Sequence, residues 1–145
     1  KIATAADFCG TRWQVNAVMI PVPHGKAFLM PVARVMELYR KHIGTHALSV
    51  EASEGLDVVA SRQADVVHLH VVNTNRERSV TASLDVAAHA ISSARAHVIV
   101  DDPMTEASDL NSDRVMQIAT KELAPGRPWE FPAASVSAID VQLAV

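Results

Sequence analysis

The chain has 145 residues, of which 49% are hydrophobic and 20% charged, and its net charge is −3 at pH 7. This size and composition fit a globular domain of ordinary size and exclude a disordered tail. Without a clustered basic stripe, nucleic acid is not an expected partner. No apolar run approaches the roughly 20 residues that a membrane helix needs, so no membrane contact is expected.

The single cysteine, Cys9, excludes an intrachain disulfide and fits a reducing compartment. We therefore expect a cytoplasmic protein, and secretion remains open. The first residue is Lys1 rather than methionine, which favours a processed or truncated product. Nothing in the sequence indicates a cofactor.

The first predicted element is a strand in the run from Asn16 to Pro23, which is short, almost wholly apolar and without polar alternation. Such a run is typical of a strand that is covered on both faces and paired with neighbours. The rest of the chain offers no evident partner for it. We therefore expect either contact with another polypeptide or packing of the first 44 residues onto the remainder of the chain.

An amphipathic helix is predicted next, because apolar residues recur at helical spacing between Lys26 and Ile43. Pro31 suits the first helical turn, since its missing N–H has no partner within a helix there. Gly44 suits the left-handed position that follows many helices. A strand, a loop and a helix in this order form half of a βαβ unit.

The remainder, residues 46–145, alternates polar and apolar residues in short runs and predicts a jelly-roll-like antiparallel β-sandwich, so the fold class is mainly β. The turn from Asn73 to Glu77 predicts a hairpin between the runs on either side of it. Residues 101–113 are expected to form a long loop. The candidate strands cover residues 56–61, 65–72, 80–86, 94–100, 114–118 and 135–143.

Several stretches resemble, in the same order, the α-L-arabinofuranosidase family of retaining glycoside hydrolases. Residues 31–45, PVARVMELYRKHIGT, resemble the family's final barrel helix, which begins on proline and ends in a Met/Leu-Tyr-x-x-His-x-Gly pattern. Residues 70–75 resemble a hairpin of its C-terminal sandwich, and residues 109–111 resemble that domain's long-loop signature. Residues 131–139 resemble its closing Pro-x-x-Ser-Val strand.

The resemblance implies a parent enzyme made of a (β/α)₈ barrel and a sandwich, which removes terminal arabinofuranosyl residues from arabinan or arabinoxylan-type carbohydrates. Residues 1–45 would be the last barrel strand and helix, and residues 46–145 the sandwich, with a structural role. Retaining hydrolysis needs two carboxyl groups about 5–5.5 Å apart. The resemblance places both glutamates upstream, so the isolated chain is expected to be inactive. A companion chain carrying the rest of the barrel, or a homo-oligomer, is the expected partner.

Four residues are candidates for contact with substrate, and none is a candidate for catalysis. His24 lies in the loop after the first predicted strand, where barrel enzymes place residues that face the catalytic mouth. Family members carry an Ala-Gln-x-Val-Asn pattern just before this strand. This chain keeps Val15 and Asn16 but has Trp13 where the glutamine is expected, so Trp13, Gln14 and Asn16 are the other candidates.

His68 and His70 lie two apart in a predicted strand and therefore face the same side. The sequence places no third metal ligand beside them, so we expect a structural or solvated pair and no metal site. Two further functions remain open. A stand-alone carbohydrate-binding sandwich would need exposed aromatic residues, but aromatics make up only 4% of the chain, and Trp129 and Phe131 are expected in the core. An oligomerisation module would also account for the unpaired first strand.

Overall fold

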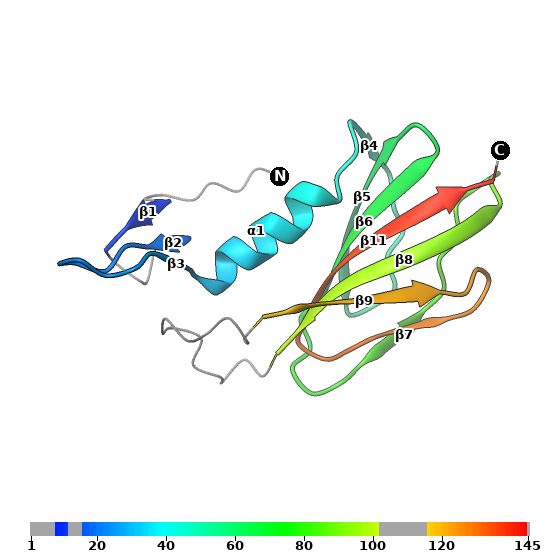
Figure 1. Ribbon diagram of the computed structural model, residues 1–145. Coiled ribbons are helices and arrows are strands. Elements are labelled where there is room, and N and C mark those ends of the chain that lie inside the picture. The colour runs from blue at the N-terminus through cyan, green and yellow to red at the C-terminus, as the bar shows by residue number, and fades with distance from the viewer. Residues whose placement is uncertain (1–7, 12–15, 102–115, 145) are drawn as a thin grey trace.

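The computed structural model describes residues 8–11, 16–101 and 116–144, which form mainly β-strands and one α-helix (Figure 1). That helix is too short to cross a membrane. In chain order the elements are β1 (Cys9–Gly10), β2 (Val18–Met19), β3 (Phe28–Leu29), α1 (Pro31–Lys41), β4 (His46–Leu48), β5 (Leu56–Gln63), β6 (Val66–Asn73), β7 (Val80–Ala82), β8 (Ile91–Val100), β9 (Ile118–Leu123), β10 (Trp129–Phe131) and β11 (Ser135–Leu143).

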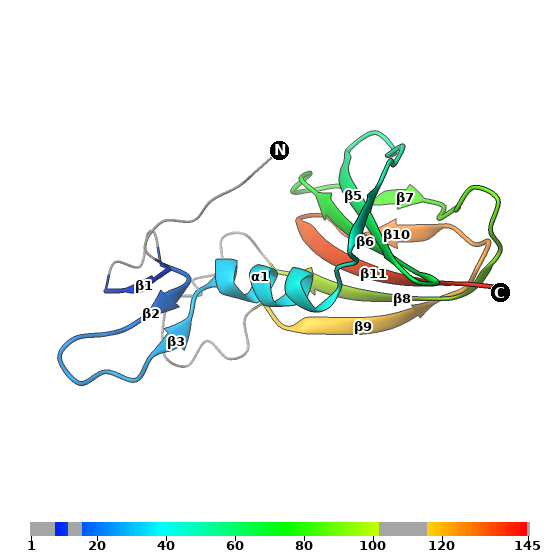
Figure 2. The same cartoon turned by 90° about the horizontal axis from the view of Figure 1, so that it is seen from above.

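The main body is a sandwich of two unequal layers. Six strands form an antiparallel sheet in the order β4-β5-β6-β11-β8-β9. β7 and β10 pair antiparallel as a separate, two-stranded layer beside it (Figure 2). The predicted β-sandwich is therefore confirmed. Apolar side chains from both layers make up the core between them, among them Leu56, Val67, Val71, Val80, Ala82, Trp129, Phe131, Ile139, Val141 and Leu143.

β11 shows why these strands form. It lies between β6 and β8 and is bonded to both along its length. Ile139, Val141 and Leu143 alternate with polar residues and are buried in the core, as the sequence predicts. Asp140 consequently points to the opposite, outer face of the sheet. That outer face carries α1.

α1 packs on the outer face through a small apolar contact. Leu38 is fully buried against Ile99 of β8 and Ala138 of β11. The single methyl group of Ala138 leaves room for the helix above the sheet. Pro31 is the first helical residue, as predicted, and Arg40 and Lys41 in the last turn suit the negative end of the helix dipole.

The helix begins at Pro31 as predicted, but the apolar spacing that extends back to Lys26 is not helical, and the predicted end near Gly44 is wrong. Residues 28–29 form β3, and Met30 is extended (φ −80°, ψ 160°) because the residue before a proline is disfavoured in the helical region. At the other end the helix stops at Lys41, with His42 as its C-cap. Gly44 is not in the left-handed conformation. It is required because a Cβ there would lie 2.4 Å from the backbone carbonyl carbon of Arg62 in β5.

The predicted hairpin across residues 73–77 is also wrong. β6 pairs with β5 and β11, whereas β7 pairs with β10 in the other layer. The buried Asn73 side chain explains the crossing: its Nδ2 donates to the carbonyl groups of Arg78, Phe131 and Pro132 at 3.0–3.1 Å, which ties the chain to the second layer. The hairpin in this region is β5–β6, which turns through Ala64 at φ 52°.

The strand predicted at 114–118 begins instead at Ile118 and continues to Leu123 as β9. β9 is the edge of the sheet, and only Leu123 is buried in it, so its side chains carry little of the expected alternation. Most of the predicted loop at 101–113 lies outside the described residues.

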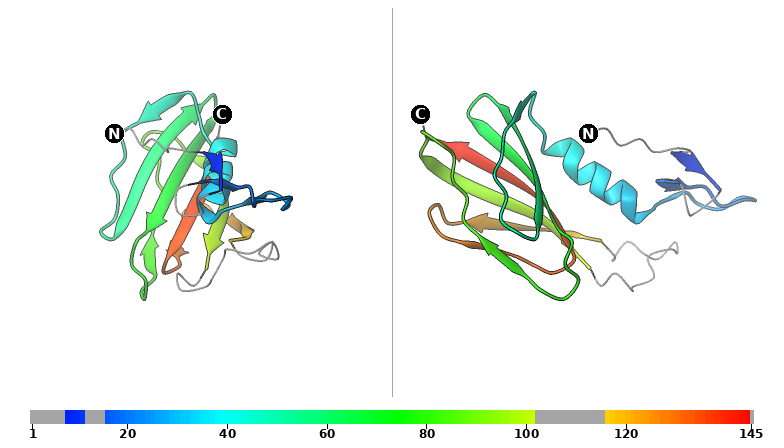
Figure 3. Two further views of the ribbon diagram at one scale, coloured as in Figure 1. Left: turned by 90° about the vertical axis from the view of Figure 1, so that its left-hand side faces the viewer. Right: turned by 180° about the vertical axis from the view of Figure 1, so that it is seen from behind.

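β1, β2 and β3 form a separate small sheet at the end of α1 that lies away from the sandwich (Figure 3). β1 and β2 are parallel, and β3 is antiparallel to β2. β2 therefore pairs on both sides within this chain, and the expectation that it has no partner here is wrong. The strand predicted from Asn16 is only two residues long here. Met19 is buried but Ile20 and Val22 are exposed, so this chain does not cover the segment on both faces.

Candidate functional site

Four histidines and an aspartate gather between the C-terminal end of α1 and the outer face of the six-stranded sheet; we call them the histidine cluster. His42 caps α1. His68 and His70 come from β6, His97 from β8 and Asp140 from β11. The predicted orientation of His68 and His70, away from the core, is therefore observed.

The register of the strands brings the cluster together. His68 lies directly opposite Asp140, and both His70 and His97 lie opposite Ala138 on the two sides of β11. Directly opposite residues in an antiparallel pair have Cβ atoms about 4.5–5.5 Å apart, so their side chains meet. Ala138, at the centre of the row, is small enough for the rings on either side to lean over it.

Asp140 is the centre of the cluster. His68 Nδ1 lies 2.7 Å from its Oδ1, and His42 Nδ1 lies 2.8 Å from its Oδ2. His97 Nε2 lies 3.5 Å from Oδ2. One carboxylate therefore contacts histidines from α1, β6 and β8 and joins the end of the helix to the sheet.

Ring contacts complete the arrangement. His42 stacks on His97 with ring centroids 4.0 Å apart, and Tyr39 stacks on His70 at 3.9 Å. His70 Nε2 donates to the backbone carbonyl of His42 at 2.6 Å. Burial lowers the pKa of both His70 and His97, which favours the neutral form of both rings, and it raises the pKa of Tyr39 to about 12.

The cluster also brings together atoms that could hold a metal ion. His42, His97 and Asp140 each offer one ligand atom, and these three atoms lie within 4.8 Å of one another. No other group of this kind occurs in the part of the chain that the structure describes. Among the histidines, the sequence pattern draws attention to His68 and His70 and not to His42 or His97, because the three residues that converge come from segments far apart in the chain. The outward position of His97 in β8 was the one signal that could have indicated it.

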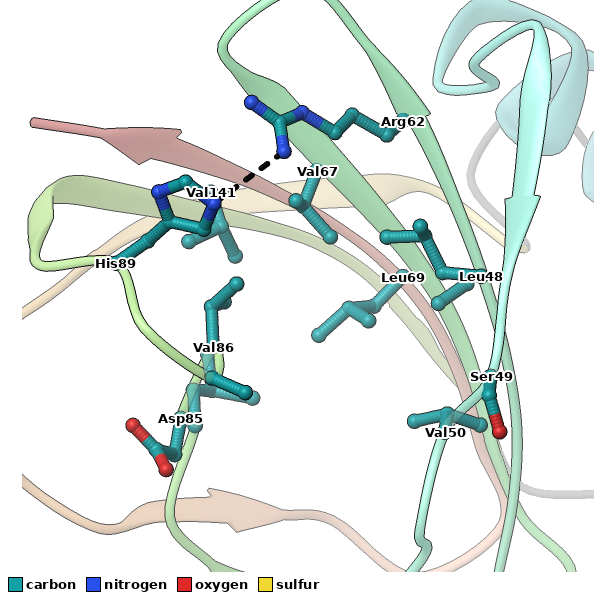
Figure 4. Close-up of a pocket in the computed structure, with 13 residues that line it drawn as sticks. Leu48, Ser49, Val50, Arg62, Val67, Leu69, Asp85, Val86, His89 and Val141 are labelled. Atoms are coloured by element: carbon teal, nitrogen blue, oxygen red, sulfur yellow. Dashed lines mark hydrogen bonds between the residues drawn. The ribbon is translucent and has the colours of Figure 1, made fainter. Parts of the chain in front are cut away.

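A pocket of about 290 Å³ lies at the open side of the sandwich (Figure 4). Arg62 and His89 lie at one end of it, with Arg62 Nη1 3.5 Å from His89 Nε2. Asp85 is the one carboxylate of its lining. Retaining glycoside hydrolysis needs two carboxyl groups, and the described lining residues supply one. Its apolar lining comes from both sides of the opening and includes Leu48, Val67, Leu69, Val86 and Val141.

Of the four candidate substrate contacts, Asn16 and His24 lie within the described residues. Trp13 and Gln14 lie outside the described residues. Asn16 is only 2% exposed, and its side-chain amide has no hydrogen-bond partner among the described residues. His24 is exposed in the turn between β2 and β3, with φ 66°. Neither Asn16 nor His24 belongs to the histidine cluster or lines the pocket.

The fold is that of known glycosidases. The structure of an α-L-arabinofuranosidase from Thermotoga maritima, in complex with arabinose, aligns with 88% of this chain and 32% of its own, with a TM-score of 0.71 and 19% identity. A thermostable GH51 α-L-arabinofuranosidase from Thermotoga petrophila aligns with 88% of this chain and 31% of its own, with a TM-score of 0.70 and 20% identity. A GH30 endoxylanase from Clostridium papyrosolvens aligns with 79% of this chain and 28% of its own, with a TM-score of 0.56 and 16% identity.

No protein-family model and no curated protein sequence matches the chain. The chain spans about a third of the length of the matched structures. The resemblance to α-L-arabinofuranosidases that the sequence motifs indicate is thus confirmed at the level of the fold.

Proposed function

We propose that this chain is the C-terminal portion of a retaining glycoside hydrolase that removes terminal arabinofuranosyl residues from arabinan or arabinoxylan-type carbohydrates. The observation that supports it is the fold shared, over 88% of this chain, with an α-L-arabinofuranosidase whose structure contains arabinose. The alignment covers about a third of that enzyme, which accords with a chain that carries only part of the parent protein. Carbohydrate would reach this chain through the parent enzyme.

Two of the described glutamates, Glu37 and Glu122, are paired with basic residues, which supports a catalytic centre elsewhere. A general acid of a glycosidase needs a raised pKa, but the hydrogen bond from Lys41 lowers the pKa of Glu37. Glu122 is bonded at 2.6 Å to Arg95 on the exposed surface of the sheet. We therefore place the two catalytic glutamates upstream in the proposal, and we expect this chain alone to be inactive.

Exposed apolar residues support a covering partner for the first part of the chain. They lie on and around the small sheet and on α1, and isolated folded proteins rarely expose contiguous apolar patches of large area. The unpartnered amide of Asn16 points the same way, because buried polar groups in complete folds are nearly always hydrogen-bonded. We propose the remaining barrel strands as the occupant. The exposed residues are Phe8, Ile20, Val22, Leu29, Val32, Met36 and Ile43.

The sandwich has a structural role in this proposal. Trp129 and Phe131 meet edge to face, with ring centroids 6.5 Å apart, and Phe131 is fully buried. They stabilise the core and form no exposed sugar-stacking platform, which does not favour a stand-alone carbohydrate-binding module. The proposal also includes a cytoplasmic location, supported by the exposed, unpaired thiol of Cys9.

The test compares this chain with the longer protein encoded with its upstream sequence. Hydrolysis of an aryl arabinofuranoside is expected from the longer protein and is expected to vanish when either upstream glutamate is replaced by glutamine. The 145-residue chain should show neither hydrolysis nor binding to arabinan or xylan oligosaccharides. Hydrolysis by this chain alone, or an upstream sequence without a barrel, would contradict the proposal. Binding without hydrolysis would favour the carbohydrate-binding module, and a stable homo-oligomer in light scattering would favour the oligomerisation module.

A further inference from the structure

We propose that His42, His97 and Asp140 form a binding site for a divalent transition-metal ion, with Zn²⁺ as the best-fitting ion. The ligand atoms come from the end of α1, from β8 and from β11, and all lie within 4.8 Å of one another. Imidazole nitrogen together with carboxylate oxygen is a donor set that zinc accepts in proteins. The proposal is independent of the glycosidase assignment.

The distances suit a zinc ion. Ligand atoms about 2.0–2.2 Å from a tetrahedral ion are separated from each other by about 3.3–3.6 Å. Around Asp140 Oδ2 the separation of 3.5 Å to His97 Nε2 lies in this range, whereas the 2.8 Å to His42 Nδ1 is a hydrogen-bond distance that must lengthen when the ion binds. The two rings are inclined by only 27°, so binding requires each ring to rotate about χ2 until both planes meet at the ion. That torsion is soft in histidine.

Neighbouring side chains orient two of the three ligands. His97 Nδ1 lies 3.1 Å from Thr120 Oγ1 in β9, and the tautomer that donates this hydrogen bond leaves Nε2 unprotonated toward the ion. His68 Nδ1 holds the other carboxylate oxygen of Asp140 at 2.7 Å, which leaves Oδ2 for the metal. Partners of this kind, bonded to the far side of a ligand, are typical of zinc sites and fix ligand orientation.

The site is shielded but open to entry. The side chains of His42 and His97 are 17% and 15% exposed, and that of Asp140 is 29% exposed. Three protein ligands leave a fourth tetrahedral position for water. Arg95 is the cation beside the site on β8, and its charge is opposed by Glu122 at 2.6 Å.

A bound ion would join two parts of the molecule. His42 belongs to α1, whereas His97 and Asp140 belong to the sheet that α1 packs against. The ion would therefore strengthen a contact that also depends on the apolar packing of Leu38 and on the hydrogen bonds that His42 makes to Asp140 and His70. An ion that binds only the folded arrangement stabilises it in proportion to its affinity and concentration.

The test is a Zn²⁺ titration of the untagged 145-residue chain, freed of metal with EDTA, in competition with a chromophoric chelator. We expect one equivalent to bind, a higher thermal midpoint with Zn²⁺, and no binding of Mg²⁺, which prefers oxygen ligands. Co²⁺ in place of Zn²⁺ should give the visible absorption of a four-coordinate ion.

Variants locate the site. His97→Gln and Asp140→Asn should each lower Zn²⁺ affinity by more than about 100-fold, whereas Thr120→Val, which removes only an orienting partner, should lower it by about tenfold. His46→Gln is the matched control, because the His46 side chain is exposed and, among the described side chains, its ring is hydrogen-bonded to Thr45. Folding of each variant is checked by circular dichroism. Absence of stoichiometric Zn²⁺ binding by the unaltered chain overturns the proposal, and so does unchanged affinity in a folded ligand variant.

Discussion

Replacing Leu38 by alanine tests whether α1 is held on the sandwich as the structure shows. Leu38 is fully buried, and its buried neighbours are Ile99 and Ala138. Fully buried Leu→Ala changes cost about 2.7–5.0 kcal/mol, through lost transfer free energy and the cavity left behind. Because this apolar contact is small and one side of it can relax with the helix, we expect the free energy of unfolding to fall by about 3 kcal/mol. A domain of this size has about 5–15 kcal/mol in total, so the variant should still fold.

The assay is urea unfolding of the 145-residue chain, followed by far-UV circular dichroism and by tryptophan fluorescence. Met36→Ala is the matched control, since Met36 lies on the same helix but is 37% exposed, and it should change stability by less than about 1 kcal/mol. If α1 unfolds before the sandwich, the circular dichroism transition of Leu38→Ala should precede the fluorescence transition. Equal stability of the two variants would refute the packing of α1 on the outer face of the sheet.

Three further substitutions test individual contacts by the same unfolding assay. Gly44→Ala should lower the free energy of unfolding by about 3 kcal/mol or more, because the added Cβ would lie 2.4 Å from the backbone of the neighbouring strand. Gly126→Ala is the control: at φ 72° and with no atom within 4 Å of the added Cβ, it should cost about 1 kcal/mol. Similar losses for the two variants would contradict the close approach at Gly44. Tyr39→Phe should leave stability unchanged or raise it by up to about 1 kcal/mol, since the hydroxyl is buried with no hydrogen-bond partner among residues 8–11, 16–101 and 116–144. A clear loss of stability would contradict this interpretation of the Tyr39 hydroxyl. Asn73→Ala should lower the free energy of unfolding by about 2–4 kcal/mol, because the carbonyl groups that accept from its side chain would lose their donor. Thr74 is exposed, so the control Thr74→Ala should change stability by less than about 0.5 kcal/mol. Equal effects would exclude the Asn73 side chain as the link between the layers.

Elements with strong local patterns were predictable. The alternation of Ile139, Val141 and Leu143 is enough to identify β11 and its buried face, and Pro31 marks the start of α1. The colinear motifs also indicated the fold that the matched arabinofuranosidase structures share. Such features depend on a few neighbouring residues, and their physical causes act locally.

Features set by distant partners were not predictable. The asparagine-rich turn after β6 satisfies the local rules for a hairpin, yet Asn73 bonds carbonyl groups near residue 132 and sends the chain to the other layer. Gly44 resembles a helix terminator, yet its lack of a side chain serves the approach to Arg62. In both cases a contact from another strand overrides the local preference.

The histidine cluster separates the two kinds of information most clearly. The two-residue period of a strand determines, from sequence alone, that His68 and His70 point away from the core. Only the tertiary structure decides that Asp140 lies opposite His68, and that His42 and His97 reach the same carboxylate. Periodicity is a property of one strand. Strand register and helix docking depend instead on which pairing of distant strands buries the apolar residues of the whole core.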